Sequence, residues 1–337
     1  PDVVETAALA NDLGHPPFGH VAEHELNRLA SAHLNDGFEG NAQSFRIVTK
    51  LAIVDESFSG LNLTNRTLNG LLKYPWLRKI GDEHVRKWGA YESERDDFQW
   101  SRQGYDPNDE RRSLEADVMD WADDVAYAVH DVDDFYRAGL IPLDRLATSD
   151  REAERFLDGA TARLQGAYTR AKLEGALEGL RPLLPSADPY DGSRQQRATL
   201  AKVASNLIAR AIRAFELVDS STGSDRVMID PDTRLLITVL KELTWQYVIQ
   251  SSQLSLQQHG QRRIIRELFE IFVDAAQKDE GDSLFPFEYQ EPLGECSNLA
   301  ERVRLAVDFI ASMTEHQALE MYTRVAGVSL GSVLSPA

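Results

Sequence analysis

The sequence predicts a nearly all-α protein, and two observations lead to that prediction. Apolar residues recur three and four positions apart in nearly every stretch longer than a dozen residues, which is the spacing of one face of a helix. Only residues 226–229 have the pattern of a short strand. With 337 residues the chain exceeds the ~250 to 300 at which a single hydrophobic core stops growing, so one large domain or two fused domains are expected.

The first half of the chain contains helical segments separated by clear breaks. Residues 3–10 form an apolar stripe that Gly14 and the following proline pair stop. A second helix is expected near Pro17, because proline is tolerated in the first turn of a helix, and it should run to residue 32. The composition of residues 81–112 is polar, charged and aromatic, which is typical of a long surface excursion. The other helices expected here are residues 41–54, 64–72 with Thr64 as N-cap, and 114–136.

The second half is helical throughout, with one candidate linker. Residues 148–189 are rich in Ala, Leu, Arg and Glu and end in Pro-Ser-Ala-Asp-Pro-Tyr-Asp-Gly-Ser, at 185–193, which is typical of a linker. The helices expected beyond it are residues 197–217, 233–250, 262–277, 298–313 and 315–326.

Composition excludes several classes of protein. Lys plus Arg number 36 and Asp plus Glu 54, a net charge of −18, so any polyanionic ligand must be held locally. A hydrophobic content of 42% excludes a disordered chain. The longest aliphatic run, residues 235–240, is far shorter than the ~20 residues that span a bilayer. The single cysteine, Cys296, and the lack of a secretory signal near the start predict a cytoplasmic protein, and because the chain begins at Pro1 within a helical pattern, we expect residues upstream of it.

Three histidines and two acidic residues lie within thirteen positions near the start. Asp12 and His15 are three apart, and His20, Glu23 and His24 follow at i, i+3 and i+4, so each set shares one face of a helix. The Gly-His-Pro-Pro-Phe-Gly turn between them folds the two helices together. A lone histidine is most simply interpreted as a partly buried polar residue. Three histidines and two acidic residues so close together instead favour a cleft lined by carboxylates and imidazoles, which is what metal-assisted hydrolysis requires.

A second acidic cluster lies on the expected helix 114–136. Asp120, Asp123, Tyr127 and Asp131 advance by three, four and four residues and therefore form one stripe. A solvated face is the simplest interpretation, but like charges at i and i+4 destabilise a helix by ~0.2 to 0.5 kcal/mol per pair. A bound cation or a set of ligand hydroxyls would explain why that cost is tolerated. A separate apolar stripe comprises Val118, Trp121, Val125 and Val129.

Four segments, in this order along the chain, carry a resemblance to a known family. They are Asp-Leu-Gly-His-Pro-Pro-Phe-Gly-His at 12–20, Gly-Phe-Glu-Gly-Asn-Ala-Gln at 37–43 with Arg46, Leu-Leu-Lys-Tyr-Pro-Trp at 71–76, and Met-Asp-Trp-Ala-Asp-Asp-Val-Ala-Tyr at 119–127. Together they resemble the deoxyguanosinetriphosphate triphosphohydrolases of the HD superfamily. The resemblance covers roughly residues 1–140 and reappears at residues 308–314.

The resemblance implies an all-α fold, an HD-domain helical bundle with additional C-terminal helices. It implies metal-dependent hydrolysis of a deoxynucleoside triphosphate, with dGTP preferred, to the deoxynucleoside and intact triphosphate. Residues 1–145 would form the catalytic core, whose N-terminal part precedes this sequence, and residues 146–337 a helical extension that completes the pocket and an oligomer interface. The implied cofactor is a divalent metal, Mn²⁺ or Mg²⁺.

The family's metal ligands fall on three positions of this chain. Asp12 stands at the aspartate of the family's His-Asp doublet, and Asn11 stands where the doublet has its histidine. Asp123 is the later ligand and is chosen over Asp124, because Tyr127 and Asp131 then fall where the family places groups that contact the sugar. A further histidine of the family would lie before Pro1.

Asn11 departs from the family pattern, since a neutral amide oxygen is a poorer ligand than imidazole for a transition metal. Three explanations are open: a deliberate substitution that traps substrate, a natural variant with altered metal use, or a protein that has lost catalysis.

The resemblance also implies catalytic roles for the first cluster. His20 is the candidate general base or nucleophile-side catalyst, with Glu23 one turn away to orient it and set its tautomer. His15 would act on the phosphate side, as an electrophilic or proton-donating partner.

Five residues are candidates for binding substrate. Lys73 would neutralise phosphate charge and Tyr74 would add a hydrogen bond. Tyr127 would pack where a 2′-hydroxyl would sit, and Asp131 would accept from the 3′-hydroxyl. Asn41, like Gln43 and Arg46, lies at a helix start that would equally suit an ordinary cap. The simpler alternatives are a helix C-terminal cation for Lys73, a core aromatic for Tyr127 and a surface acid for Asp131.

Two other functions remain open. One is another HD phosphohydrolase, such as a nucleotidase or cyclic-nucleotide esterase, and the other is a non-catalytic dNTP-binding sensor, which Asn11 favours. The family further implies a homo-oligomer, a hexamer or tetramer, that responds to dNTP effectors. Binding of single-stranded nucleic acid would need a local basic groove. The nearest candidates for such a groove are Arg194, Arg197, Arg210 and Arg213, but these are more simply interpreted as arginines scattered over helix surfaces.

Overall fold

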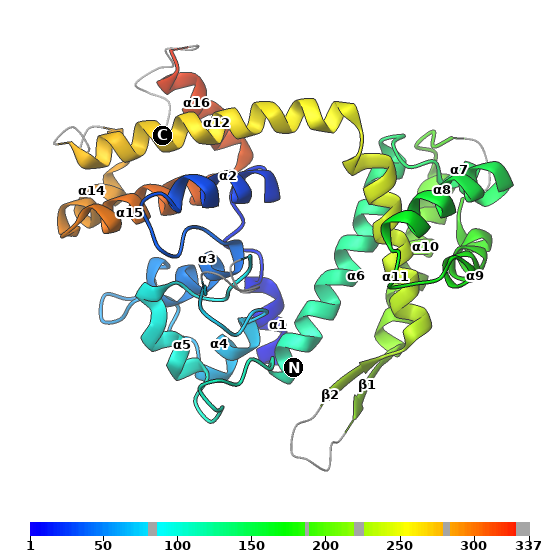
Figure 1. Ribbon diagram of the computed structural model, residues 1–337, viewed down its shortest axis with the longest axis horizontal. Coiled ribbons are helices and arrows are strands. Elements are labelled where there is room, and N and C mark those ends of the chain that lie inside the picture. The colour runs from blue at the N-terminus through cyan, green and yellow to red at the C-terminus, as the bar shows by residue number, and fades with distance from the viewer. Residues whose placement is uncertain (80–85, 186–188, 219–225, 279–283, 328–337) are drawn as a thin grey trace. The chain divides into compact units, whose positions relative to one another are not determined.

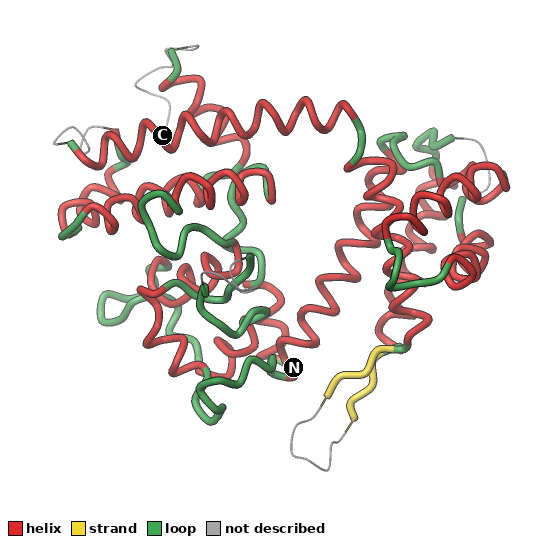
Figure 2. The backbone as a smooth tube through the Cα atoms, viewed as in Figure 1, coloured by secondary structure: helices red, strands yellow, loops and turns green. Residues whose placement is uncertain are grey.

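The computed structural model describes residues 1–79, 86–185, 189–218, 226–278 and 284–327. Within these ranges nearly all regular structure is helical, and the strands are β1 (Phe215–Val218) and β2 (Arg226–Ile229), which pair antiparallel with Phe215 opposite Ile229 (Figures 1 and 2). The predicted mainly α fold with a short β element is confirmed. None of the helices in these ranges is long and apolar enough to cross a membrane.

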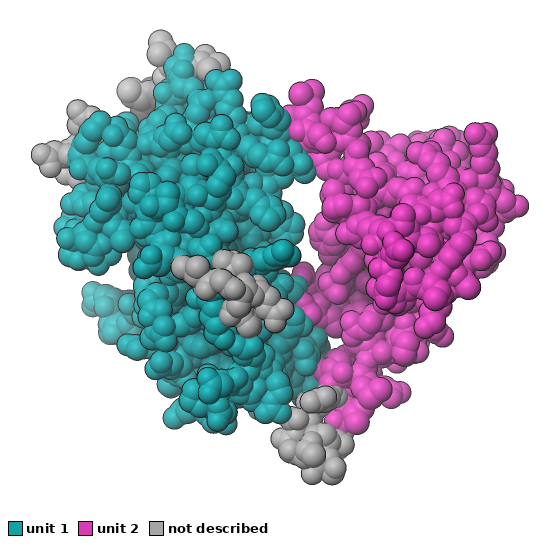
Figure 3. All heavy atoms as spheres, viewed as in Figure 1, with its two compact units in different colours: residues 1–119, 257–337 teal, residues 120–256 magenta. Residues whose placement is uncertain are grey.

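The chain packs as two units (Figure 3). Unit 1 comprises residues 1–119 and 257–337, and unit 2 comprises residues 120–256. The C-terminal helices therefore pack with the N-terminal ones. This division by packing differs from the expected division into a catalytic core, residues 1–145, and an extension, residues 146–337, which stays a prediction about function.

Unit 1 has two layers of core. In one, α2 packs with the C-terminal helices around Leu26, Phe272 and Val307, and in the other α1, α3 and α4 enclose Phe45 and Leu68. Its elements are α1 (Asp2–Ala10), α2 (His20–Ala30), α3 (Gly40–Arg46), the π-helical turn Ile47–Leu51, α4 (Asn65–Leu71), the 3₁₀ turn Glu92–Glu94, α5 (Arg95–Ser101), the start of α6 (Leu114–Arg137), most of α12 (Ser252–Gln277), α14 (Phe287–Glu295), α15 (Leu299–Ser312) and α16 (Glu315–Val325).

Unit 2 is built around the remainder of α6. The apolar stripe predicted on that helix is buried here at Trp121, Val125 and Val129, whereas Val118 belongs to unit 1 and is half-buried. The four arginines considered as a nucleic-acid groove are exposed along α10. The other elements are α7 (Leu143–Thr148), α8 (Asp150–Arg163), α9 (Arg170–Leu180), the 3₁₀ turn Arg181–Leu183, α10 (Arg194–Arg213), the two strands, α11 (Pro231–Thr244) and the π-helical turn Trp245–Ile249.

Several helix boundaries differ from those expected. The helix predicted near Pro17 begins at His20, because Phe18 and Gly19 adopt φ angles of 68° and 58°, outside the helical region. The helix predicted over residues 197–217 ends at Arg213, since the backbone of residues 215–218 pairs with β2 instead. Residues 186–188 of the expected linker lie outside the described residues. The N-cap at Thr64 is confirmed, because the Thr67 N–H donates to Thr64 Oγ1 at 3.2 Å. Helix α14 was not predicted. Helix α12 begins at Ser252 rather than at residue 262.

The prediction of a surface excursion over residues 81–112 is wrong for residues 88–91 and for Glu94, whereas residues 103–112 are mostly exposed, as predicted. Residues 81–85 lie outside the described residues. Trp88, Tyr91 and Glu94 are fully buried, and Trp88 and Tyr91 form a small core with Ala42. Burial of these two large aromatic side chains favours an interior position for this part of the segment.

A buried ion-pair network holds unit 1 together. The Arg46 guanidinium donates to Asp308 from Nη2 at 2.8 Å and from Nε at 3.0 Å, and to Glu94 Oε1 from Nη1 at 2.6 Å. Gln43 Nε2 also donates to Asp308, at 2.9 Å. The two carboxylates have 2% and 0% of their side chains exposed, so their charges depend on Arg46.

The turn before α2 is held by a close backbone approach to α3. The Gly14 N–H donates to Ser44 Oγ at 2.9 Å, and that hydroxyl donates to the Asn11 carbonyl at 2.7 Å. A Cβ at position 14 would lie 2.2 Å from the Ser44 nitrogen and 2.3 Å from the Gly40 carbonyl oxygen. Only glycine therefore fits this contact.

Replacing Arg46 by methionine is expected to destabilise unit 1 by about 3 to 5 kcal/mol, because two buried carboxylates lose their cation. Urea denaturation followed by circular dichroism measures this change. The matched control is Arg95→Met, which removes an exposed pair with Glu92 and should change the free energy of unfolding by less than about 1 kcal/mol. Equal effects of the two substitutions would contradict the role assigned to Arg46.

Gly14→Ala is expected to destabilise the protein by about 2 kcal/mol or more, since either the turn or α3 must shift to admit the methyl group. The control is Gly260→Ala on α12, where a Cβ meets nothing within 4 Å. That change should be neutral or stabilising by up to about 1 kcal/mol, because alanine favours helix. Thermal unfolding of both variants tests the difference, and an unaffected Gly14→Ala protein would refute the close contact.

Candidate active site

The turn between α1 and α2 brings Asp12 and His15 together. His15 Nδ1 lies 3.1 Å from Asp12 Oδ1, and the contact lowers the pKa of Asp12 and raises the pKa of His15. The charge of Lys73 further lowers the Asp12 pKa. Asp12 and His15 are thus paired, but the prediction that they share one face of a helix is wrong, because α1 ends at Ala10 and both residues lie beyond it.

His20 and Glu23 form the second pair, on the first turn of α2. Glu23 Oε2 accepts from His20 Nδ1 at 2.8 Å, and the rings of His15 and His20 meet edge to face with centroids 5.5 Å apart. Burial opposes ionisation of Glu23, but the hydrogen bonds from His20 and Lys87 outweigh it and hold the Glu23 pKa well below its usual range. The contact expected from the i, i+3 spacing is present, and its catalytic role stays a prediction.

Two further charged residues, which the sequence did not single out, complete the network. Lys87 Nζ lies 2.5 Å from Glu23 Oε1 and 2.9 Å from Glu39 Oε1. Glu39 is 1% exposed, and its Oε2 accepts from the Ala42 N–H at 2.9 Å as the cap of α3. Burial raises the Glu39 pKa against the influence of Lys87, while the Lys87 pKa is raised because its two carboxylates outweigh burial. The aromatic residues around Lys87 were the available signal that its segment is buried.

A small pocket of about 250 Å³ opens beside this network. It is lined by His20, Glu23, His24, Asn27, Phe38, Arg86 and Lys87. Basic side chains and imidazoles predominate in its walls, which suits an anionic group next to His20.

The oxygen and nitrogen donors differ in their fitness for a metal. His15, His20 and Glu23 offer ligand atoms within 4.8 Å of one another. Both Glu23 oxygens already accept hydrogen bonds, however, and the Lys87 ammonium opposes a cation at that point. Those three residues fit proton transfer better than metal binding.

Asn11 and Asp12 fit a cation better. Asn11 is buried, its Nδ2 donates to Asp12 Oδ1 at 3.1 Å, and its Oδ1 has no hydrogen-bond partner among the residues that the structure describes. A carboxylate beside an unpartnered amide oxygen is a donor set for an oxygen-preferring cation such as Mg²⁺ or Mn²⁺.

The predicted substrate-binding residues of unit 1 occupy three different surroundings. Asn41 Nδ2 donates to Glu39 Oε1 at 2.8 Å, so Asn41 belongs to the carboxylate network. Tyr74 packs edge to face on Trp76, with ring centroids 5.6 Å apart. Lys73 follows α4, and its carbonyl accepts from Arg112 Nε at 2.8 Å.

The remaining predicted site residues belong to unit 2. Asp123, Tyr127 and Asp131 lie on α6. Burial, together with the charge of Asp131 and the hydrogen bond to it, raises the pKa of Tyr127 to about 12. Burial also raises the pKa of Asp131. Asp124, the alternative to Asp123, pairs with Lys241 at 2.5 Å.

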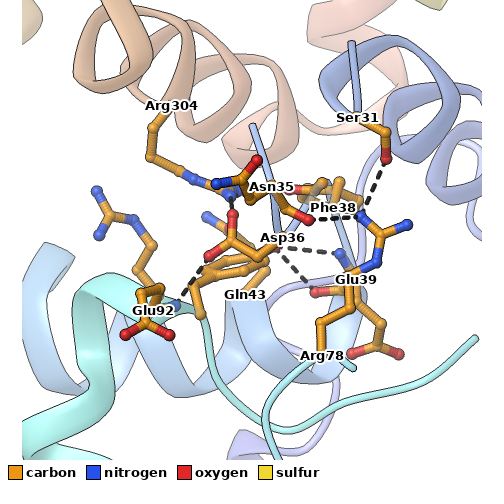
Figure 4. Close-up of polar contacts among 12 residues, drawn as sticks. Ser31, Asn35, Asp36, Phe38, Glu39, Gln43, Arg78, Glu92 and Arg304 are labelled. Atoms are coloured by element: carbon orange, nitrogen blue, oxygen red, sulfur yellow. Dashed lines mark hydrogen bonds and ion pairs between the residues drawn. The ribbon is translucent and has the colours of Figure 1, made fainter. Parts of the chain in front are cut away.

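An ion pair fixes the loop that precedes Glu39. Asp36 accepts from Arg304 Nη2 and from the Glu92 N–H, each at 2.8 Å (Figure 4). Arg304 also donates to the Gly37 carbonyl at 2.8 Å and lies over the Tyr91 ring at 3.7 Å. Helix α15 thereby supports both the Glu39 loop and the segment that carries Lys87.

Comparison with known proteins places these residues in a family. Residues 227–324 match the phosphohydrolase-associated domain. A deoxyguanosinetriphosphate triphosphohydrolase-like protein of Streptomyces coelicolor is 37% identical over an alignment of 341 positions, gaps included, that covers 97% of this chain and 78% of that protein. Proteins with the same description from Corynebacterium glutamicum and Bifidobacterium longum are 34% and 31% identical, over 98% and 96% of this chain and 78% and 70% of theirs. The resemblance carried by the four sequence segments is thus confirmed, and the chain belongs to the family of deoxyguanosinetriphosphate triphosphohydrolase-like proteins.

Proposed function

We propose that this protein hydrolyses deoxynucleoside triphosphates, dGTP in preference, to deoxynucleoside and intact triphosphate. The observation that carries the proposal is the His20–Glu23 pair, 2.8 Å apart, beside the Asp12–His15 pair in a chain of this family. The names of its relatives support the substrate class.

His20 activates water in the proposed reaction. Because Glu23 accepts from Nδ1–H, the Nε2 atom of His20 is the basic nitrogen that takes a proton from water. The water oxygen bonds to the α-phosphorus and the bond from phosphorus to the 5′-oxygen breaks. The electron pair of that bond stays on the 5′-oxygen, which must then receive a proton.

His15 supplies that proton. Its raised pKa keeps the imidazole protonated at a higher pH than usual, as a donor on the phosphate side requires. Lys73 and Tyr74 bind the triphosphate, and Arg86 in the pocket beside His20 adds positive potential. Asn41 acts through Glu39, which it contacts.

Asp12, Asn11 and Asp123 would hold the divalent metal, Mn²⁺ or Mg²⁺. When bound, the metal neutralises charge on the α-phosphate. Asp131 would accept from the sugar 3′-hydroxyl, and Tyr127 would pack where a ribose 2′-hydroxyl would lie, which selects deoxynucleotides.

Product analysis tests the proposed reaction. With dGTP and Mn²⁺, ion-exchange chromatography should detect deoxyguanosine and triphosphate in equal amounts. His20→Gln and Glu23→Gln should each lower kcat by about 100-fold or more, as expected for loss of general-base catalysis.

Other products would support other functions. Inorganic phosphate or a nucleoside monophosphate would indicate another HD phosphohydrolase. Binding of dGTP without turnover would indicate a nucleotide sensor, the alternative that Asn11 favours.

Asn11→His is expected to raise the affinity for Mn²⁺ by about tenfold or more, because imidazole replaces a neutral amide oxygen as ligand. Isothermal titration calorimetry of both proteins measures the change. Asp12→Asn is the matched control and should weaken binding, because it removes the charged ligand. An unchanged affinity in Asn11→His would contradict the ligand role of position 11.

We further propose that residues 1–145 supply the catalytic core and that residues 146–337 complete the pocket and an oligomer interface. Four further expectations rest on the family resemblance and the composition. They are a homo-oligomer, either a hexamer or a tetramer, its response to dNTP effectors, binding of single-stranded nucleic acid, and a cytoplasmic location.

A further inference from the structure

We infer that Lys87 is a positioning residue, which holds the carboxylates of Glu23 and Glu39 together and so fixes the orientation of the Glu23–His20 pair. The inference rests on the proposed function for its kinetic consequence, and on the contacts of the ammonium group for its physical basis. Lys87 Nζ bridges Glu23 Oε1 and Glu39 Oε1 at 2.5 and 2.9 Å.

The bridge determines which Glu23 oxygen faces His20. Lys87 and the Gly40 N–H, at 3.4 Å, both contact Oε1, which leaves Oε2 to accept from His20 Nδ1. A carboxylate held at one oxygen cannot rotate without losing these contacts. Lys87 therefore constrains the His20 ring through Glu23.

The bridge also prevents repulsion between two carboxylates. Both Glu39 and the ionised Glu23 are buried. Two like charges at short range in the interior repel each other strongly. Without the ammonium group, Glu23 or Glu39 would move or take up a proton. Either change alters the acceptor on which His20 depends.

Contacts of the backbone around Lys87 hold its side chain beside Glu23 and Glu39. Its carbonyl accepts from Trp76 Nε1 at 2.7 Å, and the neighbouring Gly89 N–H donates to the Trp76 carbonyl at 2.9 Å. A Cβ at Gly89 would lie 2.2 Å from the Tyr74 carbonyl oxygen, so the two segments are in close contact. The Lys-Tyr-Pro-Trp segment thus supports Lys87 as well as supplying candidate phosphate ligands.

The far end of the segment is anchored too. Trp88 and Tyr91 are fully buried, and the Glu92 N–H donates to Asp36, which Arg304 also holds (Figure 4). Tyr91 Oη lies 3.2 Å from both the nitrogen and the carbonyl oxygen of Glu39. The segment that carries Lys87 is consequently hydrogen-bonded to the backbone of Glu39, whose carboxylate Lys87 contacts.

Direct binding of phosphate is the competing role for Lys87, and the structure favours positioning. The single positive charge of the ammonium group already faces two negative charges. A substrate phosphate would have to displace one of these contacts.

Steady-state kinetics with dGTP separates the two roles. Lys87→Met should lower kcat by about 30-fold while KM changes by less than about threefold, within the range seen when a residue that orients a functional side chain is lost. Lys87→Arg keeps the charge and should recover most of the activity. Adding Glu39→Gln to Lys87→Met removes one of the two unpaired carboxylates and should also recover part of kcat.

A matched control is available on the surface of the same unit. Lys79 pairs with Glu110 at 2.6 Å, and both side chains are exposed. Lys79→Met should change neither kcat nor KM. An unchanged kcat in Lys87→Met, or a tenfold rise in its KM with kcat preserved, would overturn the inference.

Nuclear magnetic resonance provides a readout that needs no substrate. In protein labelled with ¹⁵N at its eight histidines, the His20 ring signals are assigned by their loss in His20→Gln. We expect the Nδ1–H tautomer in the unaltered protein and in Lys79→Met, and a mixture of tautomers in Lys87→Met. Identical His20 signals in Lys87→Met and the unaltered protein would overturn the inference, whereas absence of dNTP turnover by the unaltered protein would overturn only the proposed function.

Discussion

A carboxylate almost without contact to water, that of Glu39, constrains the arrangement around the candidate site. A buried charge must be paired and hydrogen-bonded, so the start of α3, Asn41 and Lys87 all converge on its two oxygens. Lys87 reaches it only because Trp88 and Tyr91 are buried beside it. The charge pairing and the aromatic packing therefore depend on each other, and together they set the acceptor that Glu23 offers to His20.

The sequence predicted what depends on short separations along the chain. Helical periodicity located most helices, and the i, i+3 spacing of His20 and Glu23 predicted a contact that one helical turn produces. The bridge from Lys87 to Glu23 spans 64 positions, and no local pattern encodes it. The helix predicted over residues 197–217 was wrong at its end for a different reason: residues 215–218 pair with the nearby strand 226–229, and this pairing overrides the helical tendency of the segment.

The donor sets separate two kinds of chemistry within a short stretch of chain. Asn11 and Asp12 present oxygen atoms, one of them without a hydrogen-bond partner among the described residues, whereas His20 and Glu23 are committed to each other. A protein that uses Asn11 in place of an imidazole would prefer a hard cation and bind it less tightly. Under the proposed function, Asn11 therefore bears on metal choice, whereas the imidazole of His20 and the carboxylate of Glu23 remain paired on α2.

The composition of unit 1 from two distant stretches of chain has a consequence for its biosynthesis. Arg46 and Asp308 are 262 positions apart in the chain. At about 5 to 20 residues per second, the ribosome therefore synthesises Asp308 roughly 13 to 52 s after Arg46. During that interval the apolar face of α2 emerges without α15 to cover it. Nascent chains of this protein should therefore depend on chaperone protection until the last helices leave the exit tunnel.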